Sequence, residues 1–216
     1  MSVSDTNRTI RWPGDPAGLT PEAVDFEAVA HVLGNTCCWG GRTVRFYSLA
    51  QHALTVCTAV QALGGMDDEN GRSLALHALL GDAWRAWLPD RPGADASAKA
   101  MEKHKRERDA VQRAVLEAAG APAELPQSWD RALELTRLRV EATLVRDLAG
   151  GDMDRVAQRG GPLFPPLKKR TAPMRPDVAA KCWLEALQAA ALRTAALRAA
   201  ESGAPESGAQ APRGEA

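Results

Sequence analysis

The chain has 216 residues, which is enough for one well-buried domain with a tail. Its 27 Lys and Arg residues balance 27 Asp and Glu residues, so net charge argues neither for nucleic acid nor for an anionic membrane as a partner. No stretch approaches the ~20 consecutive apolar residues that span a bilayer, and the polar first residues show no secretion signal. Four scattered cysteines are too few for a disulfide scaffold, so we expect a reducing, cytoplasmic location.

Apolar residues at helical spacing predict six helices along the chain. Thr20 and Pro21 form an N-cap followed by proline at the first helical position, and this helix is expected to run to about Leu33. Ser48 opens the second helix. The third is apolar almost all round, so it should lie at the centre of a bundle. The expected ranges after the first helix are 48–63, 73–88, 97–119, 128–148 and 176–200.

These elements predict a single all-α domain, in agreement with abundant alanine and an aromatic content of only 5%. An extended lead-in is expected over 1–20 and a helical core over 21–149. Residues 150–200 are predicted as a Pro- and Gly-rich arm and a C-terminal helix that packs on the core. The segment 201–216 has nothing to bury and is expected to be disordered.

A glycine and an acid, Gly81 and Asp82, stand inside the apolar third helix, in the stretch ALHALLGDAW. A mid-helix glycine costs roughly 1 kcal/mol against alanine, and a buried carboxylate is costly unless it is paired. His52 on the second helix could face Asp82, and both side chains are ordinary ligands of divalent metals. Spacing alone favours a satisfied core pair over a metal site.

Two segments, 25–54 and 74–90, resemble HD-domain phosphohydrolases related to the 5′-deoxynucleotidases. YSLAQH is similar to the end of that family's ySVA[EQ]H run, and LALHALLGDAWRAWLPD is similar to its LHALLHDAaEAylGD helix. The similarity covers roughly residues 22–190 and implies an HD-type helical bundle. In that family a divalent metal activates water for attack on a nucleotide phosphate.

The resemblance places four residues of this chain at functional positions of the family. His52 stands at the first metal-ligand position, and Asp82 at the aspartate of the HD pair. Asp90 stands at a later acid, which makes it the candidate catalytic residue, and Trp39 at an aromatic that holds substrate. The remaining positions of the family's site depart from the pattern.

The residues that differ from the family's pattern lie mainly at its metal-binding positions. Gly81 stands where the family has the histidine of the HD pair, so a metal ligand is missing there. Arg85 replaces an assisting glutamate, and Cys38 replaces a substrate-binding arginine. The final metal aspartate falls near Thr136 or Arg137, and neither is an anionic ligand. Two candidate ligands remain of four, so we expect no stably bound cofactor, and at most a weakly held Mn, Co or Mg ion.

Arginines are the candidate replacements for the metal's positive charge. Arg85 follows Asp82 by three residues, so both lie on one helix face and can pair, unless Arg85 points to solvent. Arg137 would bring a second cation. Such guanidinium groups could still bind a phosphate by bidentate hydrogen bonds. Arg42 and Arg45, after a pair of glycines, are further candidate anion contacts.

Three functions remain open from the sequence. The first is an inactive or weak HD relative that keeps a pocket for a nucleotide or a small phosphorylated ligand. The second is an active metal-dependent phosphohydrolase that works with a reduced ligand set. The third is a structural module that uses the bundle as a homodimer. The missing ligands favour the first, and none of the three requires nucleic acid or a membrane.

Overall fold

The structure, a computed structural model, describes residues 14–64, 68–93, 95–149 and 164–202, with side chains as far as 192. Within these ranges the chain is all-α and contains no β-strand. Residues 1–13 of the predicted lead-in, residues 150–163 of the predicted arm and residues 203–216 of the predicted tail lie outside the described residues. Six α-helices are present: α1 (Phe26–Asn35), α2 (Leu49–Gln61), α3 (Glu69–Leu80), α4 (Ala98–Ala118), α5 (Gln127–Leu148) and α7 (Pro176–Ser202).

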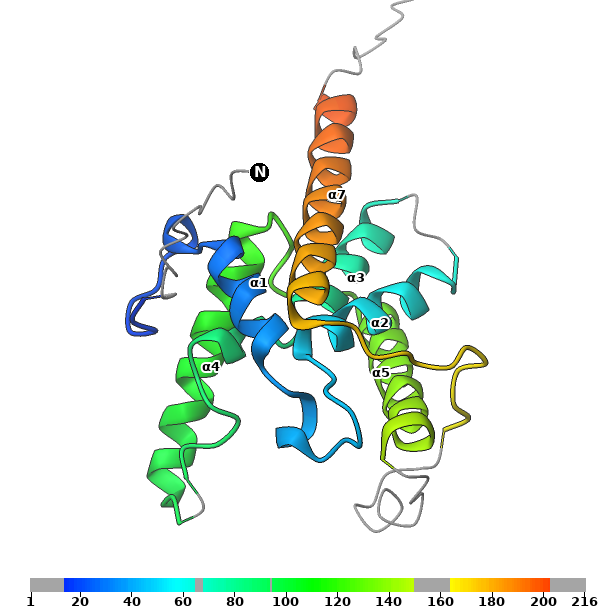
Figure 1. Ribbon diagram of the computed structural model, residues 1–216. Helices are drawn as coiled ribbons and strands as arrows, with labels where there is room; N and C mark the ends of the chain where they lie inside the picture. The colour runs from blue at the N-terminus through cyan, green and yellow to red at the C-terminus, as the bar shows by residue number, and fades with distance from the viewer. Residues whose placement is uncertain (1–13, 65–67, 94, 150–163, 203–216) are drawn as a thin grey trace, which may run out of the picture.

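Helix α3 lies at the centre, as its apolar sequence predicts. It packs against α2, α4, α5 and α7 (Figure 1). None of the described helices is long and apolar enough to cross a bilayer. The side chains of Leu74, Leu76 and Leu80 are fully buried in the common core. Burying an apolar side chain of this size contributes roughly 1.5–3 kcal/mol to folding, so the central helix contributes substantially to the core.

The C-terminal carbonyls of α3 are satisfied by side chains from three other helices. A buried helix end must find donors for these groups, because they have no partner within the helix. Gln112 of α4 donates to the carbonyl of Leu80 (3.1 Å), and Trp183 of α7 donates to that of Leu79 (3.0 Å). The third donor, from α5, belongs to the candidate site described below.

Two of the predicted helices, the first and the third, have wrong boundaries. The first helix starts at Phe26, because Asp25 accepts hydrogen bonds from the backbone of residues 27 and 28, and Pro21–Ala23 forms a separate 3₁₀ turn, η1. The third helix starts at Glu69, capped by Asp68, and ends at Leu80 rather than 88. The second helix begins at its predicted cap, since Ser48 accepts a hydrogen bond from the backbone N–H of Gln51.

Helix α7 packs across α1, α2 and α3, and its last turns extend beyond the other helices (Figure 1). Gly34 makes the close crossing with α1 feasible. A Cβ at this position would lie 2.7 Å from the carbonyl oxygen of Pro176 and 2.8 Å from the Cβ of Ala180. The sequence of α1 therefore fits α7 because residue 34 has no side chain.

Residues 164–175, called the strap here, lead into α7 without forming a helix. The Gln51 side chain of α2 donates to the carbonyl of Ala172 (2.7 Å) and accepts from the backbone N–H of Met174 (2.8 Å), so both ends of its amide are used. The strap is therefore bound to the core by side-chain to backbone hydrogen bonds, which local sequence patterns do not predict.

Candidate functional site

The candidate site lies where α3 ends. Gly81 keeps helical backbone angles (φ −57°, ψ −26°), but Asp82 leaves them (φ −108°, ψ 7°). The chain continues as a short 3₁₀ turn, η3 (Ala83–Ala86), in which the backbone N–H of Arg85 donates to the carbonyl of Asp82 (3.1 Å). This tight turn brings the Asp82 and Arg85 side chains to the same side of the chain.

Arg85 forms ion pairs with two carboxylates. Its Nε atom lies 3.1 Å from Oδ1 of Asp82, and its Nη1 atom lies 2.8 Å from Oδ1 of Asp90. The Asp82–Arg85 pair predicted from their spacing is therefore present, and Arg85 does not simply point to solvent. The side chains of Asp82 and Arg85 are about a quarter exposed, and that of Asp90 is more than half exposed, so solvent screens both interactions.

Arg137 of α5 fills the space beside Gly81. A Cβ on Gly81 would overlap the Nη2 atom of Arg137 and would lie 3.1 Å from its Cζ. The same Nη2 donates to the carbonyl oxygen of His77 (3.3 Å), which makes Arg137 the third side chain that caps the end of α3. Because the backbone at Gly81 is ordinary helix, its conformation does not call for glycine. The absent side chain leaves the room that this guanidinium occupies, and a Cβ would also lie 3.2 Å from the carbonyl oxygen of His77.

His52 of α2 faces the same cluster. Burial lowers the pKa of its imidazole, the charge of Asp82 opposes this, and the charges of Arg137 and Arg85 lower it further. Its Nδ1 atom is buried and has no hydrogen-bond partner among the described residues, whereas most buried polar atoms have one. His52 is therefore a neutral imidazole with an unused polar atom next to two guanidinium groups and a carboxylate.

The loop between α1 and α2 places Cys38 beside this cluster. Its ends are bridged by hydrogen bonds from the Cys38 N–H to the Tyr47 carbonyl (2.7 Å) and from the Leu49 N–H to the Thr36 carbonyl (2.9 Å). Burial raises the pKa of the Cys38 thiol to about 12, with a further contribution from Asp82 that Arg85 opposes. The thiol is therefore protonated and unreactive at neutral pH.

Trp39, the predicted substrate aromatic, lies in the 3₁₀ turn η2 (Cys38–Gly41) and packs against the core. Its backbone is left-handed (φ 54°, ψ 26°), which is uncommon for a residue with a side chain and marks a constrained position. The turn therefore holds Trp39, next to the buried Cys38, in a backbone conformation of higher free energy.

The structure does not bring every predicted residue into the cluster. Arg42 and Arg45 are exposed, and in the described part of the chain neither forms a hydrogen bond or ion pair with the residues around Asp82. Thr136 is buried and donates to the carbonyl of Ala132 (2.8 Å), so Arg137 is the one of the two alternatives that reaches the site.

Sequence reasoning missed the residues that support Arg85. The Arg85 guanidinium lies 5.2 Å from the ring centre of Trp84, and Arg108 lies 5.9 Å from the same ring. The charged sequence around His104, MEKHKRER, suggests a solvated surface, but His104 is only 9% exposed and its ring meets Trp84 edge-on. Its spacing of seven from the buried Val111 was the available signal.

Within the described ranges, no three His, Cys, Asp or Glu side chains lie close enough together to hold a metal ion. His52 and Asp82 are two donors, and Arg85 already neutralises the anionic one. A scan against protein-family models finds no match to the chain, and a search of curated proteins finds none either. The site therefore has to be interpreted from its own chemistry and from the resemblance of its sequence.

Proposed function

We propose that this chain is an HD-domain-like bundle that binds a nucleotide or another phosphorylated ligand without metal-dependent hydrolysis. The observation that carries the proposal is the position of two guanidinium groups. Arg137 occupies the room left by Gly81, and Arg85 is paired with Asp82. In the resembled family, positions 81 and 82 hold the histidine and the aspartate of the HD pair, and both are metal ligands. Guanidinium groups of the protein now stand beside these positions, where the metal's charge would be.

The donor set does not fit a resident divalent metal. Catalytic metal sites generally supply at least three protein ligands, and here only His52 and Asp82 face one another. The adjacent charges of Arg85 and Arg137 repel a divalent cation. A Mn, Co or Mg ion would depend on water and on the ligand's own phosphate for the rest of its coordination shell.

The same groups suit a phosphate. Guanidinium donors match phosphate oxygens in a planar, bidentate geometry. Arg137 uses Nη2 for the His77 carbonyl but is exposed overall, so its other donors remain accessible to a ligand. The unbonded Nδ1 of His52 provides a further polar atom facing the cluster. A phosphate monoester would bind here by replacing a carboxylate as the partner of Arg85.

Binding of nucleoside monophosphates, measured by calorimetry, tests this proposal. Arg137→Gln and Arg85→Gln each remove a charge-assisted hydrogen bond and should weaken binding by roughly tenfold to a hundredfold. Arg131→Gln, an exposed arginine on the same helix α5, is the matched control and should leave affinity unchanged. Equal losses in all three variants would mean that only long-range charge matters and would refute the site.

Phosphate release from nucleoside monophosphates in the presence of Mn, Co or Mg separates this proposal from an active phosphohydrolase. We expect no release above background. Turnover that disappears in His52→Ala would overturn the inactive assignment and establish the reduced-ligand enzyme. Metal-dependent release that appears in the triple variant Gly81→His, Arg85→Glu and Arg137→Asp would support descent from an HD enzyme.

A further inference from the structure

Two exposed segments meet at the C-terminal end of α5. In the loop before α2, the backbone N–H of Val44 donates to the carbonyl of Leu148 (2.7 Å). In the strap, Arg170 lies 3.5 Å from the carboxylate of Asp147, the preceding residue of α5. Residues 42–46 and 168–170, called the basic end here, are therefore fastened to consecutive residues of one helix.

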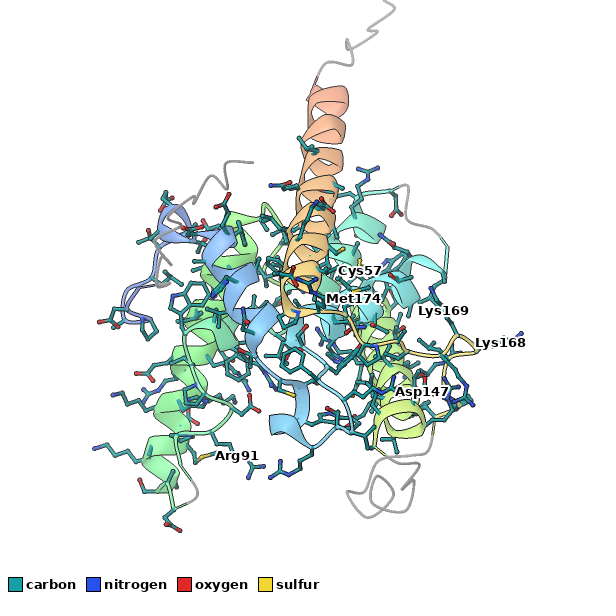
Figure 2. The ribbon with its side chains drawn as sticks, in the orientation of Figure 1. Cys57, Arg91, Asp147, Lys168, Lys169 and Met174 are labelled. Carbon is teal, nitrogen blue, oxygen red and sulfur yellow. The ribbon has the colours of Figure 1, made fainter. Side chains whose placement is uncertain are left out.

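The basic end carries an excess of positive charge. The carboxylate that it contacts, Asp147, is only 3% exposed and is already paired with Arg146. The sequence of 150–163, which follows α5, contains two aspartates and two arginines and adds no net charge. Figure 2 shows Lys168 and Lys169 at the outer turn of the strap. Its exposed cations are Arg42, Arg45, Lys168, Lys169 and Arg170.

Two exposed apolar side chains stand among these cations. Val44 is 68% exposed and Phe46 is 39% exposed, and they alternate with arginines in the sequence RTVRF. Apolar side chains on an exposed loop flanked by Lys and Arg are suited to the boundary between lipid headgroups and acyl chains. A folded protein partner would instead need a hollow complementary to this loop.

We propose that the basic end docks on an anionic phospholipid surface, with Val44 and Phe46 entering the headgroup region and the five cations facing lipid phosphates and carboxylates. The balanced total charge predicted no membrane partner, but a sum over the chain conceals the asymmetry that the fold creates at this end. The proposal is independent of the phosphate site at Arg85 and Arg137.

Sedimentation of the full chain with lipid vesicles tests the proposal. We expect the protein to pellet with vesicles that contain phosphatidylserine and not with pure phosphatidylcholine, and to be released by added salt. Lys168→Gln with Lys169→Gln should lower the partition coefficient about thirtyfold. Lys99→Gln with Lys105→Gln, two exposed lysines of α4, removes the same charge elsewhere and should have little effect.

The contribution of the exposed apolar side chains to vesicle binding is tested by a second pair of variants. Val44→Ser should lower vesicle binding severalfold, whereas Leu192→Ser, at 70% exposure on α7, should not. Equal binding to neutral and anionic vesicles, or equal losses in the control variants, would overturn the proposal. Binding to a soluble polyanion such as heparin without binding to vesicles would also overturn it.

Discussion

Asp147 at the end of α5 and Asp82 at the end of α3 each stand beside an arginine close in sequence, yet they are bound very differently. Both oxygens of Asp147 are used, because Arg146 approaches them at 2.7 Å and 2.8 Å and the backbone N–H of Thr171 donates to one of them (2.8 Å). The carboxylate of Asp147 is thus buried and hydrogen-bonded on both oxygens, and it binds the strap to α5.

Asp82 is only partly satisfied. Its side chain is 27% exposed and is approached by the Nε atom of Arg85 at 3.1 Å, while His52 beside it keeps an unbonded nitrogen. The comparison teaches that an ion pair alone does not identify a functional site. Full saturation indicates a structural role, as at Asp147, whereas unused donors and acceptors indicate capacity for a ligand, as at Asp82.

The largest expected effect comes from breaking the saturated pair. Asp147→Asn should lower the free energy of unfolding by about 2–3 kcal/mol, because it leaves Arg146 without its anionic partner and weakens the Thr171 contact. Urea denaturation measures this change. Asp177→Asn is the control, since its pair with Arg175 is mostly exposed, and it should cost less than about 0.5 kcal/mol. Equal losses would mean that saturation does not matter.

The two regions should also respond to acid in different pH windows. Burial lowers the pKa values of His52 and His77, so the unfolded chain takes up protons below about pH 6.5 while the folded chain resists them. Stability should fall as pH drops through this window, by at most about 1.4 kcal/mol per pH unit for each group. The pKa of Asp147 is lowered by Arg146, so its contribution is complete above the ordinary value of 3.8 and is lost only below it.

Unfolding free energies of the wild type, His52→Gln and His77→Gln between about pH 8 and pH 5 test this separation. Each variant should flatten part of the decline, and Asp147→Asn should leave its slope intact. An unchanged slope in His52→Gln would contradict a buried neutral imidazole at the α3 end.

A smaller effect tests whether Arg137 explains Gly81. Gly81→Ala should be neutral or slightly destabilising in the wild type, because the new Cβ displaces the guanidinium from the His77 carbonyl. In an Arg137→Ala background the same change should stabilise the protein by about 0.5–1 kcal/mol through helix propensity. Gly34→Ala is the control, because its clash with the Pro176 backbone persists in both backgrounds. Additive effects at 81 and 137 would disprove the link.

The smallest effect is expected at the partly exposed pair. A double-mutant cycle of Asp82→Asn and Arg85→Gln should give a coupling free energy of about 0.5 kcal/mol, measured by thermal unfolding. Asp90→Asn, at a carboxylate that is 60% exposed, should couple to Arg85 still more weakly. A coupling of about 2–3 kcal/mol, the size of the loss expected for Asp147→Asn, would mean that Asp82 has a structural role like that of Asp147. It would argue against a ligand site.

The sequence predicted those features that arise within one or two helical turns. Helical spacing gave the all-α class and the central place of the third helix, Ser48 was recognisable as an N-cap, and the three-residue spacing predicted the Asp82–Arg85 pair. The sequence missed the observed helix starts at Phe26 and Glu69, which are also local features. Asp25 and Asp68 competed with other plausible caps, and only their hydrogen bonds identify them.

Contacts between distant segments depended on how the helices cross. The sequence left Thr136 and Arg137 as alternatives, and the rotation of α5 against α3 selects Arg137 and explains Gly81. The donors from Gln112 and Trp183, and the Asp147–Thr171 contact, join residues far apart in the chain. Backbone propensity and hydrophobic spacing act over one or two turns, whereas packing determines which distant side chains meet, so these contacts became visible only once the helices were assembled.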